Sequence, residues 1–600
     1  MSRVQSIVRR KRNKHMKADN ETHESEHTVK TYGSLKKSLH RLARNRHLTM
    51  GIFILFFAAA GTSLIMLSRA ATTLASVKSG NWSDPTVWGG RVPGASDLAT
   101  ITGGHTVTFD ASTAKVAGVK VNSGGTLAFR TNSSSTLEST ENVVIEGKLA
   151  MRPANPSVIQ TLRFVGVNEK AMVGGGMNVL ATDKGLWVMG AGQLDITGSP
   201  KTSWTRASAA ISQGTASVTL TSAPSGWAVG DEISITPTES PAVGTASYTG
   251  FDEASITSVN GATIGLSKAT TRPHPKVNNA WTAEVMNLTR NVRLEGTASG
   301  RAHIFIRSTK PQTVNHAAIR WMGANKAYNG SEPQTEVLGR YGLHFHHNLN
   351  GSRGSIVDGT VVRDTGGKAF VPHQSHGITL KNTISYNTWR PAYWWDSQEV
   401  TNDLLVDGAM AAKTQFTDDH KYRMTGFLHD AGNGNTIRNS VSAGLRVCGC
   451  DKDGSGYLWP EISGSNVDKG VWSWDNNMTH NSNGNGLFVW QNTYVHVVQD
   501  YVGYNNGRYG IRHGAYENAY KYVGGALYAN VEGAVEVKAN GPFSFENMVW
   551  DGGGLSTHLM RTTNGSGESD QPQTIRNVTM RGFTTKAAIW MDRAPTTGSG

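Results

Sequence analysis

Cysteine is almost absent from this sequence, since only Cys448 and Cys450 occur among 600 residues. A framework of disulfides therefore does not hold the fold together, and the Cys-x-Cys spacing is not that of a zinc finger. The Gly-x-Ser-x-Gly turn of serine hydrolases and the glycine-rich loop that binds nucleotide phosphates are also missing. Charged residues make up 17% of the chain against 38% hydrophobic residues, a balance that allows a sizeable buried core.

The net charge of +13 comes mostly from the first 48 residues. They hold 13 Lys and Arg against four acids, which gives +9, whereas the remainder holds 45 against 41 and adds only +4. The basicity therefore belongs to a tail and not to a surface that binds a polyanion. We expect no nucleic-acid partner.

An uncharged apolar run follows the basic tail over residues 48–68. Its roughly 20 residues match the length of a helix that crosses ~30 Å of hydrocarbon. Three arginines lie just before it, at Arg41, Arg44 and Arg46. The positive-inside rule then places residues 1–47 in the cytoplasm and the bulk of the chain outside the cell. Small residues at the exit also allow a cleaved signal peptide, but the long basic lead favours an uncleaved signal anchor and a single-pass membrane protein.

Short runs of alternating hydrophobicity, separated by glycine turns, fill residues 76–200 and predict a small all-β module. The predicted strands are Ala99–Ile101, Thr106–Phe109, Val119–Val121, Thr126–Phe129 and Val143–Ile145. Residues 201–300 predict a second β region, with strands near Glu232 and Glu284.

Residues 301–593 have the pattern of stacked coils. A glycine followed by a short strand recurs at Gly486, Gly510 and Gly533, at intervals of 24 and 23 residues. Asparagines at the bends, such as Asn439 and Asn481, tolerate left-handed backbone. A repeat of this length predicts a right-handed parallel β-helix of the pectin-lyase type, so the fold class is all-β. Residues 594–600 have the composition of a linker.

Three histidines fall within four residues, at His344, His346 and His347, shortly after Arg340. Side chains alternate between the faces of a strand, so we expect His344 and His346 to point one way and His347 the other. Imidazoles on one face, beside a guanidinium, can transfer protons, bind a divalent metal or hold an acidic ligand. Alternatively, they form polar ladders stacked inside the solenoid.

The order of these segments resembles the CEMIP and transmembrane hyaluronidase family, which joins an eight-glycine domain to a parallel β-helix. Ser79–Ser112, with its tryptophans and glycines, is similar to the eight-glycine domain. Gly339–Asn348 is similar to the family's Gly-Arg-Tyr-Pro-x-His-Phe-His motif, with glycine in place of proline. Pro372–Gly377 is similar to its second histidine segment, and His373 and His376 carry over by position. The resemblance implies a cell-surface protein that acts on a glycosaminoglycan-like polysaccharide, with hyaluronan the family's known substrate.

The sequence departs from the family at Trp389–Ser397, which stands where the family has Gly-His-x-x-Phe-x-Glu-Asp-Gly. The glycine, the histidine and at least one acid are absent, and Asp396 stands for one of the two acids. Tyr393, Trp394 and Trp395 offer aromatic faces on which a sugar ring can stack, or else pack in the core.

These observations predict depolymerisation of a hyaluronan-like acidic polysaccharide at a site on the β-helix. The expected catalytic residues are His344, His346, His373, His376 and Asp396, and the expected substrate-binding residues are Arg340, Tyr393, Trp394 and Trp395. Hydrolysis usually needs two carboxylates, whereas elimination from a uronic acid needs a base and a cation that neutralises the carboxylate. The histidines allow either chemistry.

The histidines act in this interpretation as acid and base groups or as ligands of a divalent metal, calcium or zinc. Residues 451–457, numbered from Asp451 as the first ligand, place oxygen ligands at alternate positions and a glycine at the sixth, as a calcium loop does. However, Ile462 stands at the twelfth position, and a tight Asp/Gly turn is the favoured interpretation. Two alternatives stay open. In the first alternative, the chain is a surface adhesin that binds polysaccharide without cleaving it. In the second, it is a purely structural solenoid.

Overall fold

The computed structural model describes residues 71–326, 336–395, 400–415, 424–429, 431–447, 454–459, 470–489, 495–516, 519–539, 542–562 and 573–591. The expected anchor over residues 48–68, Asp396, both cysteines and the acids at 451 and 453 lie outside these ranges. Within the described ranges, no helix is both long enough and apolar enough to cross a membrane.

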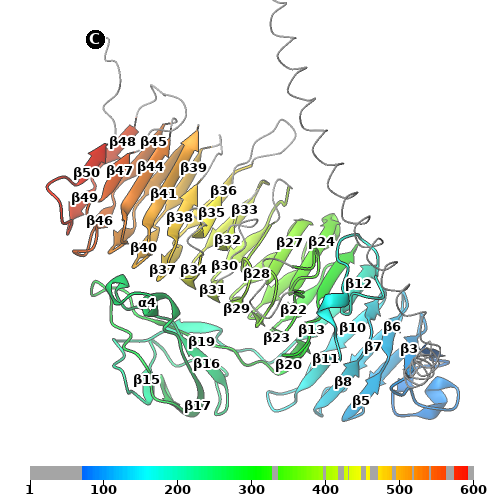
Figure 1. Ribbon diagram of the computed structural model, residues 1–600. Helices are drawn as coiled ribbons and strands as arrows, with labels where there is room; N and C mark the ends of the chain where they lie inside the picture. Colours follow the sequence, from blue (N-terminus) through cyan, green and yellow to red (C-terminus); the bar gives the residue numbers. More distant parts are fainter. Residues whose placement is uncertain are drawn as a thin grey trace, which may run out of the picture. The chain divides into compact units, whose positions relative to one another are not determined.

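The described residues form a parallel β-helix whose coils each add strands to three sheets, called A, B and C (Figure 1). The first part of sheet A contains β1 Thr72–Ala75, β3 Asp97–Ile101, β6 Gly118–Val121, β9 Val143–Ile145, β12 Leu186–Gly190, β21 Ile304–Ser308, β24 Leu343–Leu349 and β27 Phe370–Ser375. Its second part contains β32 Thr425–Leu428, β35 Ser455–Trp459, β38 Asn485–Val489, β41 Tyr509–Tyr516, β44 Gly533–Ala539, β47 Met560–Thr562 and β50 Ile589–Met591.

Sheets B and C run the length of the described solenoid. Sheet B contains β2 Gly80–Asn81, β4 Thr106–Phe109, β7 Thr126–Phe129, β10 Lys148–Met151, β13 Gln193–Thr197, β22 Thr313–Asn315, β25 Ile356–Asp358, β28 Thr379–Lys381, β30 Leu405–Asp407, β33 Asn435–Arg438, β36 Trp472–Asp475, β39 His496–Gln499, β42 Tyr520–Val523, β45 Phe543–Glu546 and β48 Gln573–Arg576. Sheet C contains β5 Thr113–Val116, β8 Ser135–Ser139, β11 Gln160–Phe164, β20 Val292–Glu295, β23 Ala317–Arg320, β26 Val361–Arg363, β29 Ile384–Thr388, β31 Met410–Thr414, β34 Val441–Leu445, β37 Met478–His480, β40 Val502–Tyr504, β43 Ala526–Tyr528, β46 Val549–Asp551 and β49 Thr579–Arg581.

Alternating hydrophobicity fixes which side chains face the interior of the solenoid. In sheet B, Leu127 pairs with Leu149 and Leu149 with Leu194, and all three are fully buried. Every strand predicted between residues 99 and 145 is confirmed, as β3, β4, β6, β7 and β9. Asn439 and Asn481 have φ angles of 53° and 50°, which confirms their left-handed backbone at the bends.

Residues 76–200 are continuous with the β-helix and do not fold as a separate module. Strand β12 pairs in parallel with β9 before it and with β21 after it, although more than 100 residues lie between β12 and β21. Each coil of a parallel β-helix has unpaired backbone N–H and C=O groups along its edge, and the next coil pairs with them. The first strands therefore belong to the same solenoid as the later ones.

The second β region is an insert between β13 and β20, with a small core of its own. Its six-stranded antiparallel sheet contains β14 Trp204–Arg206, β15 Ser217–Thr219, β16 Glu232–Ile235, β17 Asp252–Asn260, β18 Thr263–Leu266 and β19 Glu284–Asn287. The short helices are η1 Pro85–Trp88, η2 Glu169–Ala171, η3 Pro241–Val243, α4 Ala246–Thr249 and η4 Asn350–Ser352. Buried Glu284 contacts buried His480 of sheet C at 2.9 Å, which ties the insert to the β-helix.

A single residue bridges the two parts of sheet A. Tyr393 pairs with Phe370 of β27 and with Phe427 of β32, and no longer strand forms between them in the described residues. The three rings stack with centroids 4.8 Å and 4.5 Å apart, and Tyr457 continues the stack at 4.8 Å. Aromatic stacking therefore replaces part of the backbone ladder here.

Candidate functional site

Strand β24 carries histidines on the outer face of sheet A. Leu343 and Phe345 belong to the main buried core, so the alternation places His344 and His346 on the opposite face. Parallel pairing then aligns these histidines with their neighbours in the sheet. Phe305 of β21 pairs with His344, and His346 pairs with His373 of β27.

His344, His346 and His373 form what we call the histidine cluster, because each offers a ring nitrogen and these nitrogens lie within 4.8 Å of one another. The Nδ1 atoms of His346 and His373 are 3.1 Å apart. His344 is fully buried, and its Nδ1 lies 2.9 Å from the carbonyl oxygen of Gly339. His346 is half-buried and is the most accessible of the three.

Burial keeps His344 and His346 uncharged at neutral pH. It lowers the pKa of His346 to about 3, and the nearby His373, His347, Arg307 and Arg340 act in the same direction. Burial, with His346 as the next cause, also holds the pKa of His344 well below its usual range. The rings of His344 and His346 therefore retain a nitrogen lone pair that can accept a proton or bind a metal.

Comparisons with known proteins place this cluster within a recognised segment. Residues 87–208 match the model of the G8 domain, and residues 302–445 match that of the CEMIP beta-helix. The chain therefore carries one segment that is similar to the G8 domain and a later segment that is similar to the CEMIP β-helix. The family resemblance expected from the sequence is thereby confirmed, and the cluster lies entirely inside the CEMIP β-helix.

No curated protein sequence matches the chain. Solved structures that resemble it include the tailspike protein gp49 from Pseudomonas phage LKA1, with 10% identity over 88% of this chain and 77% of that chain and a TM-score of 0.25. The Gp54 tailspike of Acinetobacter baumannii bacteriophage AP22, solved with a capsular saccharide, has 12% identity over 78% and 71% and a TM-score of 0.20. The catalytic domain of a GH87 α-1,3-glucanase has 11% identity over 67% and 91% and a TM-score of 0.26.

Arg340 of the CEMIP β-helix is not available to a substrate carboxylate, which corrects the expectation. Its side chain is fully buried, its Nε lies 2.7 Å from Oδ2 of the buried Asp183, and its Nη2 donates to the carbonyl of Gly175 at 2.7 Å. Its guanidinium also lies over the ring of Trp187 at 4.5 Å. Arg340 therefore fastens the segment that contains Gly175 and Asp183 next to the cluster, and its charge is already paired.

The carboxylate of Asp183 is held ionised beside this guanidinium. Burial works to raise its pKa, but hydrogen bonds from the backbone of Val173 and Gly174, from Thr182 and from Arg340 outweigh burial and lower it. The same burial lowers the pKa of Arg340, and Asp183 opposes that shift. The pair thus persists as two opposite charges that neutralise each other.

His347 and His376 both differ from the sequence expectation. The φ angle of His347 is 51° and the pairing register shifts after His346, so the alternation ends there. The ring of His347 lies 4.3 Å from that of His346 and 4.6 Å from that of His373, and it borders the cluster instead of pointing away. His376 lies directly after β27, where its Nδ1 accepts from the backbone of Asn402 at 3.1 Å, and it is not one of the clustered histidines.

The aromatic residues expected to stack on a sugar are buried instead. Tyr393 is inaccessible, and its hydroxyl lies 2.9 Å from that of Thr383. Trp394 and Trp395 are 4% and 0% exposed. Large rings fill the interior where sheet A is interrupted, so these three residues are structural.

Arg307 is a candidate that the sequence analysis missed. It is exposed, it lies two residues after Phe305 on β21, and its charge acts on His346. Its side chain forms no hydrogen bond or ion pair with the described residues. The signal was present in the strand Ile304–Ser308, where a single arginine interrupts an apolar run, but only the pairing of β21 with β24 brings it near the histidines.

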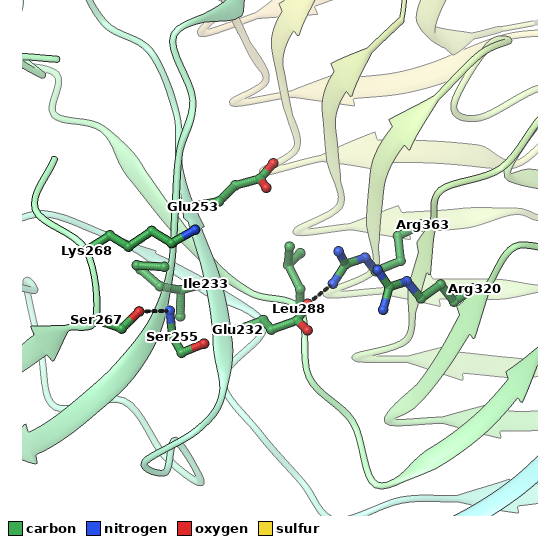
Figure 2. Close-up of a pocket in the computed structure, with 10 residues that line it drawn as sticks. Glu232, Ile233, Glu253, Ser255, Ser267, Lys268, Leu288, Arg320 and Arg363 are labelled. Carbon is green, nitrogen blue, oxygen red and sulfur yellow. Dashed lines mark hydrogen bonds and ion pairs between the residues drawn. The ribbon is translucent and has the colours of Figure 1, made fainter. Parts of the chain in front are cut away.

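A separate pocket of about 280 Å³ lies where the insert meets sheet C of the CEMIP β-helix (Figure 2). Its charged lining residues are Glu232, Glu253, Lys268, Arg320 and Arg363. Arg363 is ion-paired with Glu232, and Arg320 with Asp364 at 2.7 Å. Since both arginines are already neutralised, this pocket is a polar seam between the insert and the solenoid, and none of the predicted site residues lines it.

Proposed function

We propose that this protein depolymerises an acidic polysaccharide of hyaluronan-like chemistry at the histidine cluster. The observation that supports the proposal is the position of Arg307 beside His346 on adjoining strands of the CEMIP β-helix segment: Arg307 is exposed and has no ion pair with the described residues, and His346 is neutral and partly exposed. An arginine matches a sugar carboxylate in charge and geometry. A neutral imidazole group has a basic nitrogen that can take a proton from the same sugar.

Elimination is the chemistry that the described residues support. Hydrolysis usually needs two carboxylates, but Asp183 at the border of the cluster is buried and bound to Arg340. Elimination needs only a base near the proton on the carbon next to the uronate carboxylate and a cation for that carboxylate. That proton passes to the base, its electron pair forms a carbon–carbon double bond, the glycosidic C–O bond breaks, and the leaving oxygen takes a proton from water.

The test incubates the full-length chain with hyaluronan, with other uronic-acid polysaccharides and with a neutral glucan. Size-exclusion chromatography follows chain length, and ultraviolet absorbance follows the unsaturated uronate. We expect shortening of the acidic polymers alone, and we expect Arg307→Met to abolish it. Arg152→Met is the matched control, because Arg152 is also exposed but lies on the surface beside Asp195 of sheet B. Saturable binding without shortening would identify an adhesin instead, and neither binding nor shortening would leave a structural solenoid.

We also propose that residues 48–68 anchor the protein at the cell surface with the N-terminus in the cytoplasm. The support is the charge-free apolar run behind a tail of net charge +9. A peptide tag at each end of the full chain tests it in intact cells. Only the C-terminal tag should be accessible to added antibody, and an accessible N-terminal tag would refute this orientation.

A further inference from the structure

We propose that His344, His346 and His373 form a binding site for one first-row transition-metal dication of the zinc type. Three imidazole nitrogens converge within 4.8 Å, on adjoining strands of one sheet. Three histidines and one open position are a common ligand set for a catalytic zinc ion. The site deepens the proposed function, and only its catalytic use rests on that function.

The spacing of the nitrogens fits a common ion. Two nitrogens bound to one tetrahedral zinc at 2.0–2.1 Å lie about 3.3 Å apart. The Nδ1 atoms of His346 and His373 are 3.1 Å apart, which is close to that separation. Since the longest separation in the cluster is at most 4.8 Å, the third nitrogen must approach by roughly 1.5 Å at most, which a rotation of the ring provides.

The surroundings of His344 select the correct tautomer for a ligand. A carbonyl oxygen only accepts, so the 2.9 Å contact with Gly339 requires that Nδ1 of His344 carry the hydrogen. The lone pair is then on Nε2, which is buried and has no hydrogen-bond partner among the described residues. Histidines that bind metals almost always donate their other ring N–H in this way, usually to a carbonyl or a carboxylate. A buried nitrogen without a partner is costly unless something binds it.

Charge and donor type narrow the choice of ion. All three residues offer imidazole nitrogens, and nitrogen donors favour zinc, copper or nickel over calcium, which prefers oxygen. Asp183 neutralises Arg340, so that cation does not oppose a bound dication in full. Arg307 has no ion-pair partner among the described residues, and on the accessible side it can hold an anionic sugar next to the open position. A bound dication would occupy the lone pair of His346, so the base for the elimination would then be a water molecule at the open position, whose pKa the dication would lower.

The experiment measures metal binding without any glycan. The full-length chain is stripped with a chelator and dialysed against Zn²⁺, and the bound metal is quantified by mass spectrometry. Co²⁺ then replaces Zn²⁺ to give the visible absorption typical of tetrahedral nitrogen coordination. We expect His346→Gln and His373→Gln each to weaken zinc binding by more than about 100-fold. Replacing a residue that only hydrogen-bonds to a metal ligand already weakens metal binding by about 10–100-fold. His105→Gln and His558→Gln are matched controls, because both are partly exposed histidines outside the cluster.

Circular dichroism and thermal unfolding of the variants establish that the loss of metal is not a loss of fold. If His346→Gln does not fold, the half-buried position is also tested as His346→Asn. Unchanged zinc stoichiometry and affinity in the His346→Gln, His373→Gln double variant would overturn the proposal. Shortening of hyaluronan by the stripped chain would overturn the catalytic use of the metal and would leave the proposed function intact. Zinc bound at the cluster without any shortening of the polysaccharide would support the metal site and would contradict the proposed function.

Discussion

Replacing Arg340 with methionine tests whether this residue positions the histidine cluster or binds the substrate. In the structure both Arg340 and Asp183 are inaccessible, and their charged atoms are 2.7 Å apart. Arg340→Met removes one charge and leaves the carboxylate of Asp183 buried. Removal of one partner from a buried ion pair costs about 3–5 kcal/mol, since the remaining charge loses its compensation.

We expect the lower end of that range, about 3 kcal/mol, because three other groups still donate to Asp183. The backbone N–H groups of Val173 and Gly174 lie 2.7 and 2.9 Å from its carboxylate, and the hydroxyl of Thr182 lies at 2.8 Å. The cost should appear locally, in the segment between residues 172 and 183. A loss of 3 kcal/mol corresponds to roughly a hundredfold faster amide exchange, since each tenfold change is about 1.4 kcal/mol.

Hydrogen exchange followed by mass spectrometry measures this directly on peptides that cover residues 172–183. Arg340→Met should lose protection there, and the Arg340→Met, Asp183→Asn double variant should recover part of it, because no charge is then left unpaired. Arg438→Met is the control: Arg438 pairs with Asp407 at 2.9 Å but is 47% exposed, so its loss should cost less than about 1 kcal/mol. Unchanged protection in Arg340→Met would refute the positioning role.

Three further predictions concern stability. Tyr393→Phe should cost about 1 kcal/mol through the lost hydrogen bond to Thr383. Tyr393→Ala should cost about 3–5 kcal/mol through the cavity it leaves, and equal melting temperatures for the two variants would contradict the stacking role. Burial lowers the pKa of both His303 and His429 to about 3. The unfolded chain therefore binds more protons between pH 6.5 and 3, and each histidine should cost about 2 kcal/mol of stability at pH 5 relative to pH 7. A midpoint of urea unfolding that stays constant as the pH is lowered from about 7 to about 5 would contradict this prediction. Glu284→Gln should loosen the insert, because it weakens the buried contact with His480, and proteolysis between residues 200 and 290 should become faster.

The repeating pattern of the sequence was sufficient to predict the solenoid. The spacing of Gly486, Gly510 and Gly533 corresponds to β38, β41 and β44, which are successive strands of sheet A. Strand periodicity and turn residues are local signals, so the strands near residues 99–145 were also predictable. What these signals could not give was the continuity of the first coils with the later ones, because the pairing of β12 with β21 crosses the whole insert.

The sequence by itself determined that histidines gather on one strand, because His344 and His346 are two residues apart and two is the period of a strand. Only the tertiary structure decided which other groups meet them. Parallel pairing of the strands places His373 beside His346 and Arg307 on the strand next to both. Arg340 is instead buried in an ion pair with Asp183. The tertiary structure also buried Tyr393 and its neighbouring tryptophans, since an aromatic run suits a sugar platform and a packed core equally well. The physical reason is that burial and charge pairing depend on contacts between residues far apart in the sequence, and a local sequence pattern does not predict such contacts.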